Sequence, residues 1–349
     1  MTLVGISGCT ALLLTGFGIR DSISKIVDIQ FTEIQKYDSM LILDEELSAE
    51  SQEINTFLAN NNIDNPLYTH TETLTFQSDG KKIDCYLFAF PDNDITQYFN
   101  LTDTKDNQLS LSDNGAIIVE KMADTLNVDV GDTITLRDTN NEIYVIKIAG
   151  ISKNYVNNYI YMNKEYYELA FNNKISYNSI ITNIADKGNI VMDSNYFSTI
   201  QYSDDNMDML NDIINNMRNI VYLIIGFSSF LAITVLYNLT SINISERLRE
   251  IATLKVLGFN NKEISMYVYR ETIILTTIGI AIGLILGIGL DYFVLVVAEP
   301  DEIIFIKEIS YLSYIFTVII MVFFTILVQA ITSIILKKIN MIDSLKSVE

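Results

Sequence analysis

Four long apolar segments divide the chain. Residues 2–19 carry no charged side chain, and three later segments, residues 220–244, 272–298 and 312–336, are apolar over 25, 27 and 25 positions. A helix needs about 20 apolar residues to cross the hydrocarbon core of a bilayer. The later segments are long enough, and the first is close to the minimum. The pattern predicts a multi-span α-helical membrane protein with four transmembrane helices, the first of them partial.

The first apolar segment has three interpretations. A signal peptide would begin with basic residues, and none precedes this run. Residues 6–9 (ISGC) resemble a lipoprotein signal, but the apolar run continues beyond Cys9, where a mature lipoprotein becomes polar. The third interpretation is a transmembrane helix whose cytoplasmic start lies before Met1. We prefer it, and we expect that Met1 is not the natural beginning of the protein.

Residues 20–218 show the mixed periodicity of an α+β domain. Spacings near 3.6 predict helices and alternation with period two predicts strands. We expect helices at residues 22–34, 48–60, with Ser48 as the N-cap, and 120–126. We expect strands at residues 37–43, 68–76, 82–90, 114–119, 133–137, 142–151 and 159–162, the second and third of which form a hairpin around Ser-Asp-Gly.

Charge separates the domain from the apolar segments. The 349 residues carry a net charge of −20, although the mean hydropathy is +0.27. Residues 20–218 hold 32 Asp and Glu against 14 Lys and Arg, a net charge of −18. A water-exposed domain between the first and second spans explains both values. The acidity also argues against a nucleic-acid partner, which requires clustered Lys and Arg.

Loop charge predicts the orientation. Residues 245–271 contain five Lys and Arg and residues 337–349 contain three, whereas residues 299–310 contain one Lys and four acids. The positive-inside rule places the first two segments in the cytoplasm. Residues 20–218 are then extracytoplasmic, and the protein is expected in the plasma membrane of a bacterium. The predicted domains are residues 1–19, 20–218 and 219–349.

The sequence offers no set of catalytic residues. Cys9 and Cys85 lie in segments of different character and are not expected to meet, and His70, the only histidine, is expected in a solvated loop. The acids at positions 92, 94, 204 and 205 are typical of solvated loop charge rather than a calcium site. No Gly-x-x-x-x-Gly-Lys-Ser/Thr phosphate loop occurs. We expect no enzyme activity, no metal and no cofactor.

Glycine spacing indicates close helix packing in the third span. Gly279, Gly283 and Gly287 repeat every four residues, the small-xxx-small spacing that lets two helices approach in lipid. Glycine is also simply common in membrane helices. We favour a close-packed interface over that alternative. Asp291 lies in the same span, and we expect it at the membrane interface.

A helical hairpin is predicted between the second and third spans. Leu248, Ile251, Leu254 and Leu257 recur every three residues, which indicates an amphipathic helix. Gly258 suits the position after a helix, where the left-handed conformation is required. Asn260 followed by Glu263 predicts the start of the next helix. Phe259 would then be exposed at the tip, and an ordinary charged loop would not need these features.

These residues carry a family resemblance. The segment NISERLREIATLKVLGF, residues 243–259, followed by Lys-Glu-Ile at 262–264, resembles FtsX-like permease domains of MacB-type ABC transporter permeases. Their pattern is roughly E-R-x-x-E-I-(A/G)-x-(L/I)-(K/R)-(A/V)-L-G. The matching positions are Glu246, Arg247, Glu250, Ile251, Leu254, Lys255, Leu257 and Gly258. Residues 338–346 and 114–136 are similar to the tail and to the periplasmic core of the same family. The resemblance is weakest over residues 20–110.

The resemblance implies a permease subunit without nucleotide chemistry of its own. Its hairpin would bind a separate cytoplasmic ATPase, and a second permease copy or a fused half would complete the membrane assembly. Such proteins transmit ATPase movement to the outer domain, for export or extraction of a lipoprotein, peptide or antimicrobial. The alternative is an FtsX-like signalling subunit that activates an extracytoplasmic cell-wall hydrolase. We expect the contact to use Leu248, Ile251, Leu254 and the turn Leu257, Gly258, Phe259 and Asn260.

Overall fold

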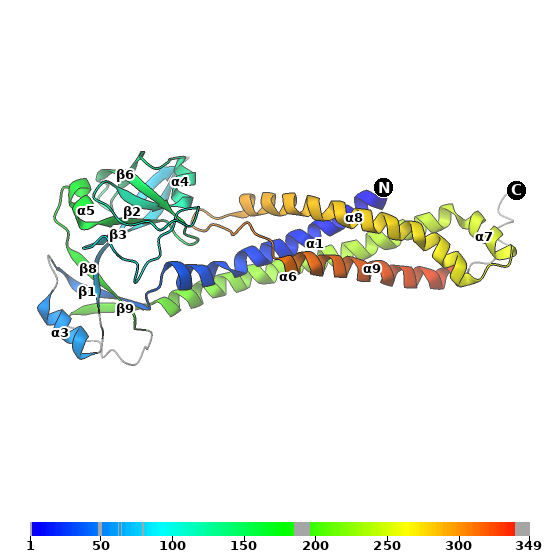
Figure 1. The fold of residues 1–349 in the computed structure, drawn as a ribbon, viewed down its shortest axis with the longest axis horizontal. Coiled ribbons are helices and arrows are strands. Elements are labelled where there is room, and N and C mark those ends of the chain that lie inside the picture. Colours follow the sequence, from blue (N-terminus) through cyan, green and yellow to red (C-terminus); the bar gives the residue numbers. More distant parts are fainter. Residues whose placement is uncertain are drawn as a thin grey trace. The chain divides into compact units, whose positions relative to one another are not determined.

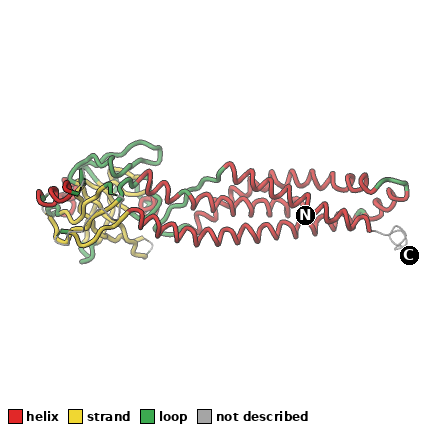
Figure 2. The backbone as a smooth tube through the Cα atoms, turned by 90° about the horizontal axis from the view of Figure 1, so that it is seen from below, coloured by secondary structure: helices red, strands yellow, loops and turns green. Residues whose placement is uncertain are grey.

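The protein consists of two compact units. The computed structural model describes residues 2–47, 51–61, 63, 65–78, 80–184 and 196–338. The helical unit comprises Met1–Ile23, Asn215–Ala298 and Lys307–Glu349, and the sheet unit comprises Ser24–Ile214 and Glu299–Ile306. Figure 1 labels their helices and strands, and Figure 2 separates helix from strand by colour. The predicted cytoplasmic tail beyond residue 338 lies outside the described residues.

Four long helices form the helical unit and lie alongside one another in both views (Figures 1 and 2). They are α1 (Thr2–Ser24), α6 (Ser203–Glu246), α8 (Asn261–Ala298) and α9 (Tyr311–Lys338). Each overlaps a segment that is long and apolar enough to cross a membrane. The fold class is therefore the predicted one: four apolar helices, with an α+β domain between the first and the second.

The core of the helical unit combines all four helices. Ile6 and Leu13 of α1 are fully buried, and the same cluster contains residues of α6, α8 and α9, namely Ala232, Leu236, Ile280, Met321 and Val328. Many apolar side chains of α6, α8 and α9 are exposed, for example Phe227 and Phe230, each at 72%, whereas those of α1 are mostly buried. Exposed apolar surface of this extent suits a lipid environment.

The sheet unit contains nine strands in the order β3-β7-β4-β6-β5-β2-β8-β1-β9. β2 also pairs with β3, so strands β2 to β7 close into a ring. The remaining strands extend from the first residues of β2. The strand bounds are β1 Ser39–Leu47, β2 Leu67–Ser78, β3 Lys81–Phe90, β4 Ala116–Val119, β5 Thr133–Arg137, β6 Ile143–Ser152, β7 Tyr159–Asn163, β8 Tyr177–Thr182 and β9 Phe197–Tyr202.

Short helices complete the sheet unit. They are α2 (Ile26–Asp28), the π-helix η1 (Ile29–Ile34), α3 (Gln52–Asn60), α4 (Glu120–Leu126) and α5 (Lys164–Phe171). The N-cap of α3 is Ser51, whose hydroxyl accepts a hydrogen bond from the Ile54 amide, and not Ser48 as predicted. Ser48 itself lies outside the described residues. Ser51 takes the cap because its extended backbone aims the side chain at the first turn.

His70 corrects a second prediction. It lies within β2, is only 7% exposed and is not in a solvated loop. Its Nδ1 lies 2.6 Å from the Ser176 carbonyl oxygen, and its Nε2 lies 3.2 Å from the Tyr167 hydroxyl. Because a carbonyl only accepts, Nδ1 carries the proton and Nε2 accepts from Tyr167. His70 therefore links β2 to α5 and to the segment before β8.

Replacing His70 by leucine is expected to destabilise the sheet unit. The change leaves the Ser176 carbonyl and the Tyr167 hydroxyl without their partner, at a cost of about 2–3 kcal/mol in the free energy of unfolding. Thermal unfolding of the purified chain, followed by circular dichroism, measures the loss. His70→Gln is the matched control, because its amide can still donate to the carbonyl. Equal unfolding midpoints for both variants would contradict the assigned hydrogen bonds.

Candidate functional sites

The predicted hairpin is present and its turn has the expected geometry. The first helix, α7, spans Leu248–Val256, and Gly258 follows with φ of +90°. The Phe259 amide donates to the Leu254 carbonyl at 3.2 Å, a bond that closes a Schellman-type end. The Asn260 amide donates to the Glu263 carboxylate at 2.9 Å and opens α8. Local sequence therefore defines this turn.

The tip of the hairpin is apolar and exposed. Leu257 is 69% exposed and Phe259 is 50% exposed. A shallow pocket beside Phe259 is lined by Glu250, Thr253, Leu254, Phe259, Glu263 and Ile264. Of the other predicted contact residues, Glu246, Glu250, Gly258 and Asn260 are exposed as well. The side chains of Leu248 and Lys255 lie outside the described part of the chain.

Ile251 is wrong as a predicted contact residue. It is fully buried in a cluster with Ile244 and Ile264, against which Leu254 and Tyr269 pack. The apolar stripe therefore holds the two helices of the hairpin together and cannot face a partner at this position. Arg247 forms an ion pair with Glu271 of α8 and is likewise engaged within the hairpin. Among the described side chains of the hairpin, the exposed large apolar ones are Val256, Leu257, Phe259 and Met266.

The three glycines of α8 contact α1. A Cβ atom placed on Gly279 would lie 2.8 Å from the Ile6 side chain, and one on Gly287 would lie 2.9 Å from Leu14. At Gly283 it would lie 2.5 Å from Thr10 Cβ and 2.7 Å from the Ser7 carbonyl oxygen. Real Cβ atoms do not approach this closely. The structure thus identifies the first span as the partner that spacing alone left unnamed.

Asp291 lies at the same helix pair and is buried within the helical unit. It is 3% exposed, and a Cβ on Gly18 of α1 would clash with its carboxylate. This Oδ1 has no hydrogen-bond partner among the described residues. The neighbouring Asp21 is well satisfied, because it accepts hydrogen bonds from Arg20 at 2.7 Å, the Ser313 hydroxyl at 2.5 Å and the Ser310 amide at 3.0 Å.

The connection between α8 and α9 belongs to the sheet unit. We call residues Glu299–Ile306 the strap. Its Ile304 amide donates to the Tyr155 carbonyl at 2.9 Å, and its Glu302 carbonyl accepts from the Asn157 amide at 2.7 Å. Lys121 of α4 forms a 2.6 Å ion pair with Glu299, and both side chains are largely buried, at 15% and 11% exposure. The sequence predicted only an acidic loop here.

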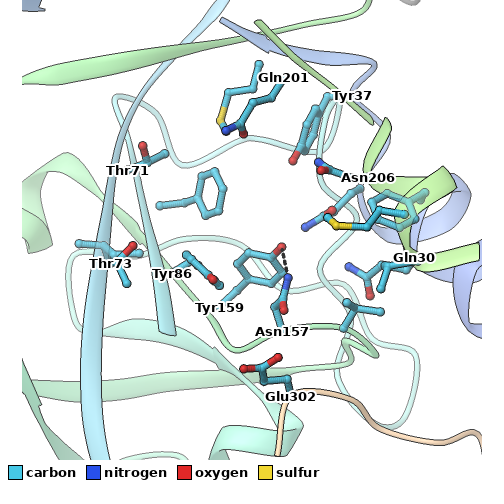
Figure 3. A pocket seen from close by; sticks show the side chains of 18 of the residues that line it. Gln30, Tyr37, Thr71, Thr73, Tyr86, Asn157, Tyr159, Gln201, Asn206 and Glu302 are labelled. Atoms are coloured by element: carbon cyan, nitrogen blue, oxygen red, sulfur yellow. Dashed lines mark hydrogen bonds between the residues drawn. The ribbon is translucent and has the colours of Figure 1, made fainter. Parts of the chain in front are cut away.

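A cavity of about 570 Å³ opens in the sheet unit. Figure 3 shows Thr71 and Thr73 of β2 on one side, Gln30 and Asn206 on the other, and Tyr86 and Tyr159 between them. Burial raises the pKa of the Tyr86 phenol, and Tyr159 and Glu302 raise it further. No sequence motif marked this cavity, because its walls come from strands, helices and the strap, which are far apart in the chain.

Metal chemistry and disulfide bonding are not indicated in the described residues. No group of three or more His, Cys, Asp or Glu side chains among them is arranged to hold a metal ion. Cys9 and Cys85 are both free and buried, one in each unit.

Comparison with known proteins finds a family match for the C-terminal part of the chain. Residues 222–341 match the family model of the FtsX-like permease C-terminal domain, as the hairpin motif predicted. No curated protein matches the chain in sequence. Among solved structures, the chain is similar to the extracellular domain of the noncanonic ABC-type transporter YknZ from Gram-positive bacteria. The two sequences are 15% identical. The match covers 44% of this chain and 85% of the YknZ domain, with a TM-score of 0.30.

A second similar structure is the periplasmic region of MacB from Actinobacillus actinomycetemcomitans. It is 10% identical, 51% of this chain and 94% of that one are covered, and the TM-score is 0.28.

Proposed function

Starting from the FtsX-like permease domain formed by residues 222–341, we propose that this chain is the membrane subunit of an ABC-type system. A separate cytoplasmic ATPase binds the exposed turn of the hairpin. Its opening and closing moves the helices of the permease and, through them, the sheet unit. The work is export or extraction of a lipoprotein, peptide or antimicrobial from the envelope. The chain carries out no chemical step itself, and a second permease copy or a fused half completes the assembly.

The continuity of α6 carries this proposal. It is one helix of 44 residues, from Ser203 to Glu246, and it begins directly after β9. A helix of this length extends over about 66 Å. Its backbone hydrogen bonds are internal to the helix, and this makes an α-helix a stiff element. We infer that a displacement at the hairpin end of α6 reaches the sheet unit along this helix.

The strap supports transmission at a second point. It connects α8 to α9, yet its backbone is hydrogen-bonded to residues 155–157 of the sheet unit. The ion pair between Lys121 and Glu299 adds a largely buried contact. We expect movement of α8 and α9 to act on the sheet unit through the strap. This adds to the movement that α6 transmits.

Orientation follows from charge. The hairpin holds five Lys and Arg, and the strap has three acids and no basic residue. By the positive-inside rule, the hairpin and the C-terminus face the cytoplasm and the sheet unit lies outside. The hairpin is then on the side where ATP is available.

Phe259→Asp is expected to reduce capture of the cognate ATPase by at least tenfold. A charge at the exposed tip would have to be desolvated in an apolar interface, which costs several kcal/mol unless it is paired. The measurement is co-purification of the ATPase with the affinity-tagged permease from membranes. The fold should be unaffected, because Phe259 is half exposed and contributes little to the core.

Leu169→Asp is the matched control for this experiment. Leu169 is also an exposed apolar residue, at 73%, but it lies on α5 of the sheet unit. It should capture as much ATPase as the unmodified chain. If Phe259→Asp captures as much as Leu169→Asp, the hairpin turn is not the ATPase contact. A separate pull-down with the sheet unit distinguishes the alternative function. Recovery of a cell-wall hydrolase, instead of a peptide or lipoprotein, would favour a signalling subunit that activates such a hydrolase.

A further inference from the structure

We propose that the cavity of the sheet unit is a binding site for a peptide segment that is uncharged or positively charged. The inference rests on the proposed permease function and names the class of its substrate. It is carried by three features of the cavity: the chemistry of its walls, the absence of basic side chains among its lining residues, and the segments of the chain that form it.

The walls combine hydrogen-bonding groups with aliphatic surface. Gln201 and Asn206 present side-chain amides to the cavity, and the hydroxyls of Thr71, Thr73 and Tyr37 lie around it (Figure 3). Amides pair with the carbonyl and amide groups of a peptide backbone.

The aliphatic wall favours a peptide over a carbohydrate. Met209, Leu210 and Ile213 recur on one face of α6 and line the cavity together with Met40 and Ile42 of β1. Met209 is 60% exposed and Ile213 is 44% exposed, so this apolar face is in contact with solvent. Methionine and branched side chains accommodate apolar peptide side chains of varied shape. A ligand that buries this face gains hydrophobic stabilisation.

The charge of the cavity selects against anions. Its lining residues include no Lys, Arg or His, whereas the carboxylate of Glu302 lies at one edge (Figure 3). Tyr86, Tyr159 and Phe88 line the same region, and aromatic faces attract ammonium and guanidinium groups. A lipid phosphate or an acidic peptide would find no counter-charge here. A lysine or arginine side chain would find both a carboxylate and aromatic rings.

The cavity is formed by the segments that connect the sheet unit to the spans. Gln30 and Phe31 belong to η1, which follows the first span, and Met209 belongs to the start of α6. Glu302 belongs to the strap between α8 and α9. A bound peptide thus contacts chain that leads to all four apolar helices. Ligand occupancy and the position of these segments are thermodynamically linked, since a ligand that prefers one arrangement shifts the chain toward it.

The test uses the full chain in nanodiscs of zwitterionic lipid. The probe is a short fluorescent peptide of alternating leucine and lysine, and binding is measured by fluorescence anisotropy against empty nanodiscs. Leu210→Trp fills the cavity and Glu302→Lys reverses its charge. Each is expected to weaken binding at least tenfold. Leu169→Trp on α5 and Glu53→Lys on α3 make the same changes on exposed residues outside the cavity and should leave binding unchanged.

Two further probes give the opposing outcomes. A peptide of alternating leucine and glutamate should not bind, and neither should a chitin oligosaccharide. The proposal is overturned if either binds through Leu210, or if the leucine–lysine peptide binds all four variants equally. Thermal unfolding confirms that each variant is folded. ATPase capture through Phe259 is measured in parallel: capture without peptide binding rejects only the cavity, whereas peptide binding without capture rejects the ATPase contact of the proposed function.

Discussion

Gly283→Leu is expected to disrupt the helical unit. A Cβ at this position would lie 2.5 Å from Thr10 Cβ and 2.7 Å from the Ser7 carbonyl oxygen. Because the carbonyl belongs to the backbone of α1, it cannot rotate away, and the two helices must separate. Overpacking typically costs about 1–3 kcal/mol, and a backbone clash belongs at or above the upper end. We expect a large loss of monodisperse protein in size-exclusion chromatography and a lower unfolding midpoint.

Gly289→Leu on the same helix is the matched control. A Cβ at Gly289 meets no atom within 4 Å. The substitution adds the same side chain to the same apolar helix. Leucine also has a higher helix propensity than glycine. Its yield and midpoint should equal or exceed those of the unmodified chain. A comparable loss in both variants would mean that leucine harms α8 in general, and that close approach of α1 is not the reason.

Lys121→Ala is expected to release the strap. The ion pair with Glu299 is largely buried, and removing one partner of a buried pair costs about 3–5 kcal/mol because a charge remains in a poorly solvated place. The amide of Ile304, which now donates to the Tyr155 carbonyl, should lose protection. Hydrogen exchange monitored by mass spectrometry over residues 299–306 is the measurement. We expect exchange at least tenfold faster there, and reduced export with ATPase capture unchanged.

Lys153→Ala provides the comparison for an exposed pair. Lys153 and Asp106 also lie 2.6 Å apart, but Asp106 is 80% exposed, so the loss should be about 0–1 kcal/mol. The charge swap Lys121→Glu with Glu299→Lys should restore much of the protection in the strap. If Lys121→Ala exchanges no faster than Lys153→Ala over residues 299–306, the ion pair does not hold the strap in place.

Short sequence patterns were sufficient to predict those helices, strands and turns whose formation depends on neighbouring residues. The predicted helix at residues 120–126 and the predicted strand at 133–137 match α4 and β5 in their bounds. The hairpin turn was also predictable, because a left-handed glycine and a capping pair act on adjacent residues. Four apolar helices long enough to cross a membrane were predictable from apolar length alone, since the bilayer sets the length that a spanning helix needs.

Burial was the first property that local patterns misjudged. His70 looks solvated in Tyr-Thr-His-Thr, yet β2 brings it to Tyr167 and Ser176, which are about a hundred residues away in the chain. Ile251 looks available on an amphipathic face, yet Ile244 and Ile264 cover it. Periodicity shows that one face of an element is apolar and cannot show which surface covers that face.

The sequence by itself determined the four apolar helices, the α+β character of the domain, the hairpin turn and the family that the C-terminal part matches. Only the tertiary structure decided that α1 is the partner of the α8 glycines, that the strap belongs to the sheet unit, and that a cavity lies among η1, α6 and the strap. The physical reason is the range of the interactions. Turns, caps and apolar length act between neighbours in the chain, whereas these contacts join segments up to about 270 residues apart and depend on how the whole chain packs.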